Sequence, residues 1–139
     1  MSDIFLSSAH SSAMQAQAVA EALRALGYSV WRDDELPAHR AYREVIQERI
    51  AEAKAVVVVW SGDAIKSEWV LSEANRGREA HKLVQLRIDN SLLPMPFEQI
   101  QCADLRDWAG DANAPGWRKV VASVAELMGA GAAATHGCG

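Results

Sequence analysis

The sequence predicts an α/β protein with a flavodoxin-like three-layer sandwich: a five-stranded parallel sheet with helices on both faces. The strongest indication is the run Ala55-Val-Val-Val-Val-Trp60, because an unbroken β-branched series is typical of a central strand buried on both faces. A second indication is that segments with strand-like patterns alternate with segments of helical apolar spacing. Strands joined in this way bring their carboxyl ends to one edge of the sheet, where ligands bind.

The individual elements follow from apolar spacing and from residues that begin or end helices. Gly27 follows the first helical pattern and is expected to be its left-handed C-terminal cap. Pro94 and Pro96 indicate irregular structure over residues 89–101, because proline removes a backbone donor. In chain order, the expected elements are a strand over 3–7, a helix ending at Leu26, a strand over 28–31, a polar loop over 32–40, a helix over 42–53, the central strand over 55–60, a helix over 67–80, strands over 83–88 and 102–105, and a closing helix over 117–127.

Composition limits the class of protein. The chain has 139 residues, half of them apolar, which is enough for a single core over residues 1–128. The net charge of −4 and the absence of a basic block argue against nucleic-acid binding. No apolar stretch approaches the roughly 20 residues of a membrane span, and no signal peptide precedes the first strand, so a cytoplasmic protein without membrane contact is expected.

The cysteines and the chain end add two further expectations. Cys102 and Cys138 lack the spacing of metal ligands, and neither a metal site nor a structural disulfide is expected. Residues 129–139 are mostly Gly and Ala, which is typical of a flexible linker or tail. We therefore expect the domain to have other domains of a longer parent chain as neighbours.

Two familiar nucleotide sites are excluded by the loop after the first strand. This loop reads Ser7-Ser-Ala-His-Ser-Ser12 and contains no glycine, so neither a dinucleotide fingerprint nor a triphosphate-binding loop is present. A phosphoacceptor site would need acidic residues at the ends of the first and third strands. Those positions carry Ser8 and Ala9, and Trp60 and Ser61.

The segment Ser67-Glu-Trp-Val-Leu-Ser-Glu73 is the main candidate for chemistry. Its spacing places Trp69 and Glu73 on one face of a helix, one turn apart. The structural interpretation is that Ser67 is an N-cap, Trp69 packs into the core and Glu73 is solvated on the surface. The functional interpretation is that an indole and a carboxylate line one site.

Four segments in order resemble the Toll/interleukin-1 receptor (TIR) domain family, as found in bacteria, over residues 3 to about 108. They are Asp3-Ile-Phe-Leu-Ser-Ser8, Trp31-Arg-Asp-Asp-Glu-Leu-Pro37, the Ser-x-Trp-Val-x-x-Glu pattern from Ser67 to Glu73, and Leu92-Leu-Pro-Met-Pro-Phe97 with Asp104-Leu-Arg-Asp-Trp108. The first segment departs from the family at Ser8, where a tyrosine is usual. The second has Pro37-Ala38-His39 where the family commonly has Pro-Gly.

The resemblance implies an activity and a set of site residues. Enzymatic members of the family hydrolyse or cyclise NAD⁺, which is a substrate and not a cofactor, and their catalytic glutamate corresponds to Glu73. Trp69 would stack on nicotinamide or adenine. The remaining substrate-binding candidates are Ser8, Ala9, His10, Trp31, Arg32, Arg40 and Ser67. For His10, Arg32 and Arg40, the alternative is an ordinary surface position in a polar loop.

Two other functions remain open at the level of the sequence. Many TIR domains act as catalytically silent adaptors that pack against other TIR domains through the second loop. A sensor that binds NAD⁺ without turnover is a third possibility. Enzymatic members also assemble head to tail, so self-association is expected together with catalysis, and bacterial antiphage defence and interference with a host are both compatible roles.

Overall fold

The structure, a computed structural model, describes residues 3–32 and 42–129. Five parallel strands form one sheet in the order β2-β1-β3-β4-β5. This is the flavodoxin-like order, and the predicted fold class is confirmed. The elements are β1 (Ile4–Ser7), α1 (Ala13–Ala25), β2 (Val30–Arg32), α2 (Tyr42–Glu52), β3 (Ala55–Trp60), α3 (Glu68–Glu79), β4 (Leu83–Arg87), β5 (Cys102–Asp104) and α4 (Pro115–Met128), with short 3₁₀ helices at His10–Ser12, Ala64–Lys66 and Phe97–Gln99.

Strand β3 is the centre of the sheet, as its composition predicted. It pairs with β1 on one side and with β4 on the other, and all six of its side chains are fully buried. A strand enclosed in this way needs apolar residues on both faces, which the four consecutive valines supply.

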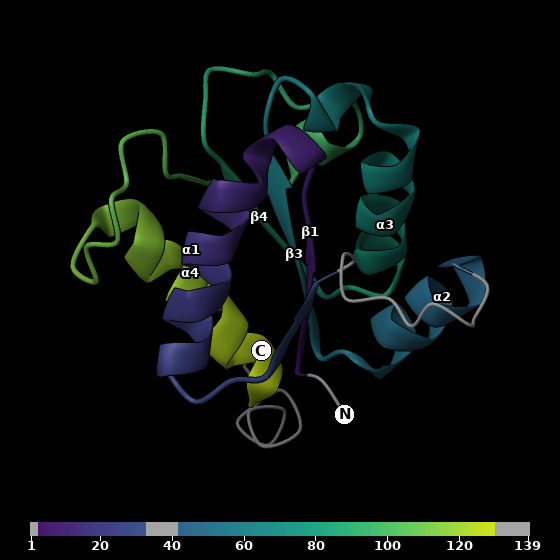
Figure 1. The fold of residues 1–139 in the computed structure, drawn as a ribbon, viewed down its shortest axis with the longest axis horizontal. Helices are drawn as coiled ribbons and strands as arrows, with labels where there is room; N and C mark the ends of the chain where they lie inside the picture. Colours follow the sequence, from purple (N-terminus) through teal and green to yellow (C-terminus); the bar gives the residue numbers. More distant parts are fainter. Residues whose placement is uncertain (1–2, 33–41, 130–139) are drawn as a thin grey trace.

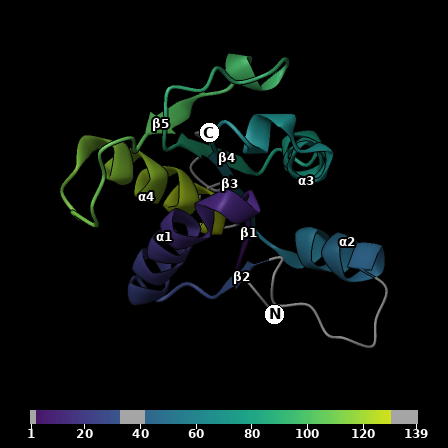
Figure 2. The ribbon, with the colours of Figure 1, turned by 45° about the horizontal axis from the view of Figure 1, so that its top comes forward.

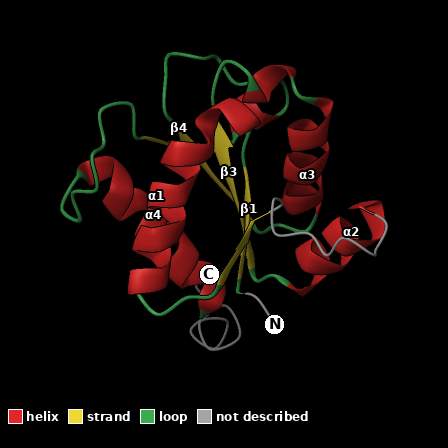
Figure 3. Cartoon of the chain, viewed as in Figure 1, coloured by secondary structure: helices red, strands yellow, loops and turns green. Residues whose placement is uncertain are grey.

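Helices cover the sheet on two sides, so the molecule has three layers. Helices α1 and α4 lie on one face, and α2 and α3 lie on the other (Figures 1 and 2). Figure 3 shows the strands between the two helical layers. Because side chains alternate along a strand, Leu6 and Val57 belong to the core under α1 and α4, whereas Phe5 and Val58 belong to the core under α2 and α3.

Most predicted boundaries are confirmed, and the exceptions have simple causes. Gly27 has a φ of 98°, the left-handed conformation expected of a residue that ends a helix. The first helix, predicted to end at Leu26, ends at Ala25, and Leu26 is its C-cap and 50% exposed. The predicted irregular segment 89–101 contains one 3₁₀ turn at Phe97–Gln99.

Two further expectations, on membrane spans and on the C-terminal tail, can be compared with the described residues alone. No helix among them is long and apolar enough to cross a membrane. Of the predicted tail, only Gly129 lies in the described part of the chain.

Candidate active site between helices α2 and α3

Glu73 is a buried carboxylate in the second turn of α3. Its side chain is 2% exposed, so the interpretation of Glu73 as a solvated surface residue is wrong. The hydroxyl of Ser7, the last residue of β1, donates a hydrogen bond of 2.5 Å to Glu73 Oε1. Burying a carboxylate costs free energy unless other groups compensate its charge. A glutamate at this position is therefore unusual for a structural residue and is a candidate for a functional one.

A pocket of about 280 Å³ opens beside Glu73 between α2 and α3. The α3 residues that line it recur at helical spacing, which places them on one face of the helix. Trp69 is half-buried: it contacts the core under α2 and α3 and also lines the pocket. The lining consists of Ile46 and Gln47 from α2, and Glu68, Trp69, Ser72, Glu73 and Arg76 from α3. The predicted pairing of Trp69 with Glu73 therefore occurs at a pocket wall.

Two residues of the α3 region position this helix and so determine where Glu73 lies: Ser67 at its start and Gly77 in its third turn. Ser67 is the N-cap and its hydroxyl accepts the Val70 backbone N–H at 3.2 Å, so the structural role foreseen for Ser67 is present. Gly77 lies one turn after Glu73, and a Cβ at this position would come within 2.9 Å of Val56 Cβ. The missing side chain lets α3 approach β3 closely, which brings Glu73 within reach of Ser7.

Lys82 anchors the C-terminal end of α2, the second helix that lines the pocket. Its ammonium donates hydrogen bonds of 2.6 Å to the Ile50 carbonyl and 2.7 Å to the Ala53 carbonyl. These carbonyls lie at the C-terminal end of α2, where backbone acceptors lack partners within the helix. Burial lowers the pKa of Lys82 from its usual value. The contact joins α2 to the turn between α3 and β4, and so fixes the two helices that line the pocket.

Sequence reasoning missed several residues of this site, of which Ser7, Gln47 and Arg76 are polar groups beside the pocket or Glu73. Ser7 was part of a recognised motif but had no assigned role, and Arg76 and Gln47 were not nominated. Arg76 follows Trp69 by seven residues, so the helical spacing of the α3 face was a usable signal. An arginine beside a pocket is a charge-assisted donor that suits a phosphate group.

The loop after β1 is close to this site through Ser7. Ser8 is half-buried, Ala9 is 9% exposed and packs in the core under α2 and α3, and His10 is exposed at the start of a 3₁₀ turn. None of these three is among the described residues that line the pocket. Their nomination as substrate contacts stays a prediction.

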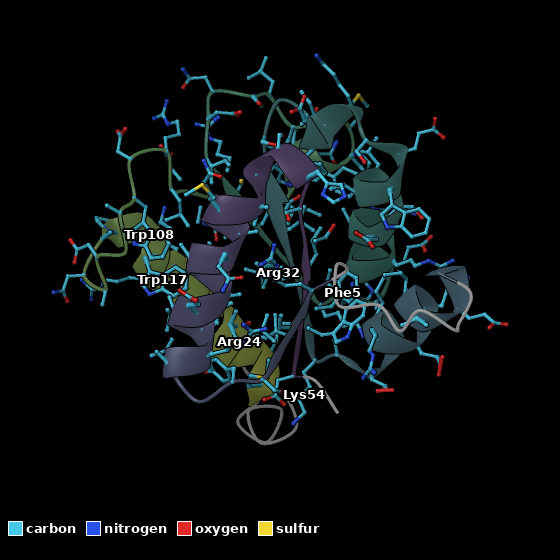
Figure 4. The ribbon with its side chains drawn as sticks, viewed as in Figure 1. Phe5, Arg24, Arg32, Lys54, Trp108 and Trp117 are labelled. Carbon is cyan, nitrogen blue, oxygen red and sulfur yellow. The ribbon has the colours of Figure 1, made fainter. Side chains whose placement is uncertain are left out.

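The structure separates two neighbouring candidates of β2. Trp31 lies on the Glu73 side of the sheet but is 6% exposed and stacks on Phe5, with ring centroids 5.3 Å apart. Arg32 is 8% exposed, and its Nη1 donates to Gln17 Oε1 of α1 at 2.5 Å. Figure 4 shows Arg32 toward α1 and Phe5 toward α2. Arg32 is thus not brought together with Glu73, and Arg40 lies outside the described residues.

A second polar pocket of about 290 Å³ lies at the carboxyl ends of the central strands. Ser11 donates to Asp63, and Asp89 accepts from the Gly62 backbone and from Ser91. Burial disfavours the ionised form of Asp89, but these hydrogen bonds outweigh it and hold the pKa of its carboxyl below the usual range. The carboxylates of this pocket are exposed or half-buried. The pocket beside Glu73 is the better candidate, because it combines a buried carboxylate with the indole of Trp69.

Comparisons with known proteins agree with this architecture. The chain is similar to the TIR domain of the Toll-related receptor TRR-2 from Hydra magnipapillata (TM-score 0.79, 16% identity, 90% of this chain and 99% of that one). It is also similar to a TIR-STING receptor from C. gigas (TM-score 0.67, 16% identity, 91% of this chain and 40% of that one). The TIR domains of the activated Roq1 resistosome, which recognises the effector XopQ, match with a TM-score of 0.58 and 23% identity over 91% of this chain and 84% of that one.

These three structural matches are distant in sequence, at 16–23% identity, and describe the fold. No curated protein matches the chain in a sequence comparison. The family model for the TIR domain, however, matches residues 4–121, a span that includes all five strands and the helix that carries Glu73. This chain therefore belongs to the TIR domain family.

Proposed function

We propose that this TIR domain cleaves the bond between nicotinamide and ribose in NAD⁺, and that Glu73 is its catalytic residue. The observation that carries the proposal is the position of Glu73: 2% exposed, hydrogen-bonded to Ser7, and in the wall of a pocket of about 280 Å³ beside Trp69. Strongly perturbed environments of this kind are typical of functional carboxylates.

The chemistry requires only one carboxylate. The bond between C1′ of the ribose and the pyridinium nitrogen breaks with both electrons going to the nitrogen, so nicotinamide leaves as a neutral molecule. An ordinary glycoside needs a second carboxylic acid to protonate its leaving oxygen, but this leaving group needs no proton. Glu73 stabilises the positive charge that develops on the ribose, an electrostatic role that is strongest in a dry, preformed pocket.

Water completes the reaction when its oxygen bonds to C1′ and a proton is released, which gives ADP-ribose. If the adenine of the same molecule attacks C1′ instead, the product is a cyclic isomer. Trp69 favours the second outcome if, once nicotinamide has left the pocket, the adenine stacks on it near the ribose. A Trp69→Ala variant with an unchanged cyclic fraction of product would contradict this role.

The dimensions of the pocket indicate which part of the substrate it holds. Its volume of about 280 Å³ lies at the lower end of ligand pockets, which span roughly 300–1,000 Å³. We therefore assign it to the nicotinamide and its ribose, with Arg76 at the rim as a donor to the pyrophosphate. The rest of NAD⁺ would contact other surfaces, and a second copy of the domain in a head-to-tail assembly would supply them.

The test is nicotinamide release from NAD⁺ at high protein concentration, with Glu73→Gln and Glu79→Gln compared to the unchanged domain. Glu79 is an exposed carboxylate of the same helix, so both variants lose one negative charge. We expect Glu73→Gln to lower the rate by at least about 100-fold and Glu79→Gln to leave it unchanged. Equal rates for all three proteins would refute the assignment of Glu73.

Self-association gives the test a second arm. Specific activity is expected to rise with protein concentration, since each assembled copy would complete the site of its neighbour. A constant specific activity over a wide dilution series would contradict the assembly. If no nicotinamide is released under any assembling condition, Glu73 is not catalytic. NAD⁺ binding without turnover would then indicate a sensor, and no NAD⁺ binding a TIR adaptor.

A further inference from the structure

Ser7 occupies a position where the fold favours an apolar side chain. It ends β1, pairs with Val58 of the central strand and is fully buried. The other residues of β1, Ile4–Leu6, are apolar and belong to the two cores. A buried hydroxyl costs free energy unless it is hydrogen-bonded, and the acceptor that Ser7 reaches is Glu73 Oε1, 66 positions away in the sequence.

We propose that Ser7 is a positioning residue for Glu73: its hydroxyl fixes the orientation of the carboxyl group and favours the ionised form that the reaction needs. This inference rests on the proposed function. It assigns Ser7 no contact with substrate, because Ser7 lies beneath α3 and is not among the described residues that line the pocket.

The surroundings of Glu73 explain why a donor is needed there. Burial disfavours the charged form of a carboxylate, and a hydrogen bond donated to it favours that form. From α3, Glu68 adds a like charge and Arg76 an opposite one at the pocket. Helix α2 contributes Ile46 and Gln47, which carry no charge, and β1 contributes Ser7. Ser7 is the group that acts on the carboxylate from the sheet side.

The hydrogen bond also has a geometric effect. A glutamate side chain has three rotatable bonds, and its terminal torsion is broad. Anchoring Oε1 to the rigid end of β1 restricts that torsion, so the carboxylate is held ready before substrate arrives. Preorganisation of this kind is the main source of electrostatic catalysis.

The test compares Ser7→Ala with Ser61→Ala. Ser61 is a matched control because it follows β3, is 5% exposed and uses its hydroxyl to accept the Ala64 backbone N–H at 3.2 Å. The first readout is the titration of the Glu73 carboxyl carbon by NMR of ¹³C-labelled protein, with the signal assigned by its loss in Glu73→Gln. Ser7→Ala is expected to raise the titration midpoint by on the order of one pH unit, and Ser61→Ala to leave it unchanged. An unchanged midpoint in Ser7→Ala would overturn the proposal.

The second readout is the pH profile of nicotinamide release. Ser7→Ala is expected to lower kcat on the order of tenfold at neutral pH, to shift the acid limb to higher pH by the same amount as the titration, and to change KM little. A shifted titration with an unchanged pH profile would overturn the positioning role. If the unchanged domain releases no nicotinamide, the proposed function fails, whereas the titration still decides whether Ser7 controls Glu73.

Discussion

The two faces of the sheet are built differently. Under α1 and α4, the core consists of apolar side chains from all five strands and both helices, and the buried polar residues described on that side are Ser12, the N-cap of α1, and Arg32, at the edge strand. Under α2 and α3, the same sheet carries Ser7, Glu73 and Gln85 as buried polar residues next to its apolar core. On the face under α1 and α4, the buried polar residues lie at a helix end and at an edge strand. On the face under α2 and α3, they come from the inner strands β1 and β4 and from the middle of α3.

The buried polar groups on the second face are not equivalent. Gln85 accepts a hydrogen bond from Trp60 Nε1 at 3.1 Å and donates to the carbonyls of Phe97 at 3.1 Å and Ile100 at 3.2 Å. These hydrogen bonds hold residues 97–100, the segment before β5, against strand β4. Glu73, in contrast, is held by Ser7 at the wall of a pocket. Gln85 also adjoins a pocket, but a small one of about 90 Å³, and its amide is used to join two segments, whereas Glu73 presents a carboxylate at the wall of a larger pocket beside Trp69.

The largest effect on stability is expected at the apolar face. Trp117 of α4 is 3% exposed and stacks on Trp108 with centroids 4.8 Å apart (Figure 4). Trp117→Ala should lower the free energy of unfolding by about 4 kcal/mol, measured by urea denaturation. Trp108→Ala, at a half-buried position, should cost about 1–2 kcal/mol. Nicotinamide release per folded molecule should be unchanged in both variants. A loss of activity larger than the loss of folded protein would show that the core under α1 and α4 also affects the site on the other face.

A smaller loss is expected at the structural polar residue. Gln85→Met keeps the approximate volume but leaves the Trp60 indole and the carbonyls of Phe97, Ile100 and Gln101 without this partner, which should cost about 2–3 kcal/mol. Gln101→Met is the control, because that side chain is exposed, and it should change stability by less than about 0.5 kcal/mol. Equal stabilities for the two variants would mean that Gln85 does not hold the segment.

The close approach of α3 to the sheet gives a third prediction. Ala is a better helix former than Gly by about 1 kcal/mol, but the added Cβ would meet Val56 and overpacking costs about 1–3 kcal/mol. Gly77→Ala should therefore lose about 1 kcal/mol and reduce activity, since an outward shift separates Glu73 from Ser7. Exposed Glu79→Ala on the same helix should lose neither. A gain of about 1 kcal/mol in Gly77→Ala would show that α3 has room at this position.

The smallest effect, and of opposite sign, is expected at Glu73 itself. Glu73→Gln keeps an acceptor for the Ser7 hydroxyl and removes a buried charge, so the free energy of unfolding should rise by about 0.5–1 kcal/mol. The comparison is thermal and urea unfolding beside Glu79→Gln, which should change by less than about 0.5 kcal/mol. A loss above about 2 kcal/mol would mean that Glu73 is a structural residue.

The parts of the fold that depend on local pattern were predictable. The valine run identified β3, the Ser67 N-cap identified the start of α3, and the four-residue spacing placed Trp69 beside Glu73. In each case neighbours in the sequence decide the structure, through strand burial, a helix cap or the helical repeat.

Contacts between distant segments were not predictable in this way. Ser7 and Glu73 are 66 positions apart, and no local pattern pairs them. The depth of Glu73 depends on the packing of Gly77 against Val56, which only the assembled sheet reveals. One separation was predictable from the sequence: Trp31 and Arg32 are consecutive in β2, so their side chains point to opposite faces of the sheet.

The most direct test of the account is to measure activity and stability together in Glu73→Gln. In Glu73→Gln we expect nicotinamide release to fall by at least about 100-fold while the free energy of unfolding stays the same or rises. Together these two results would show that the Glu73 carboxylate is needed for catalysis and does not stabilise the fold. Retained activity, or a loss of activity that only follows a loss of folded protein, would contradict the central claim.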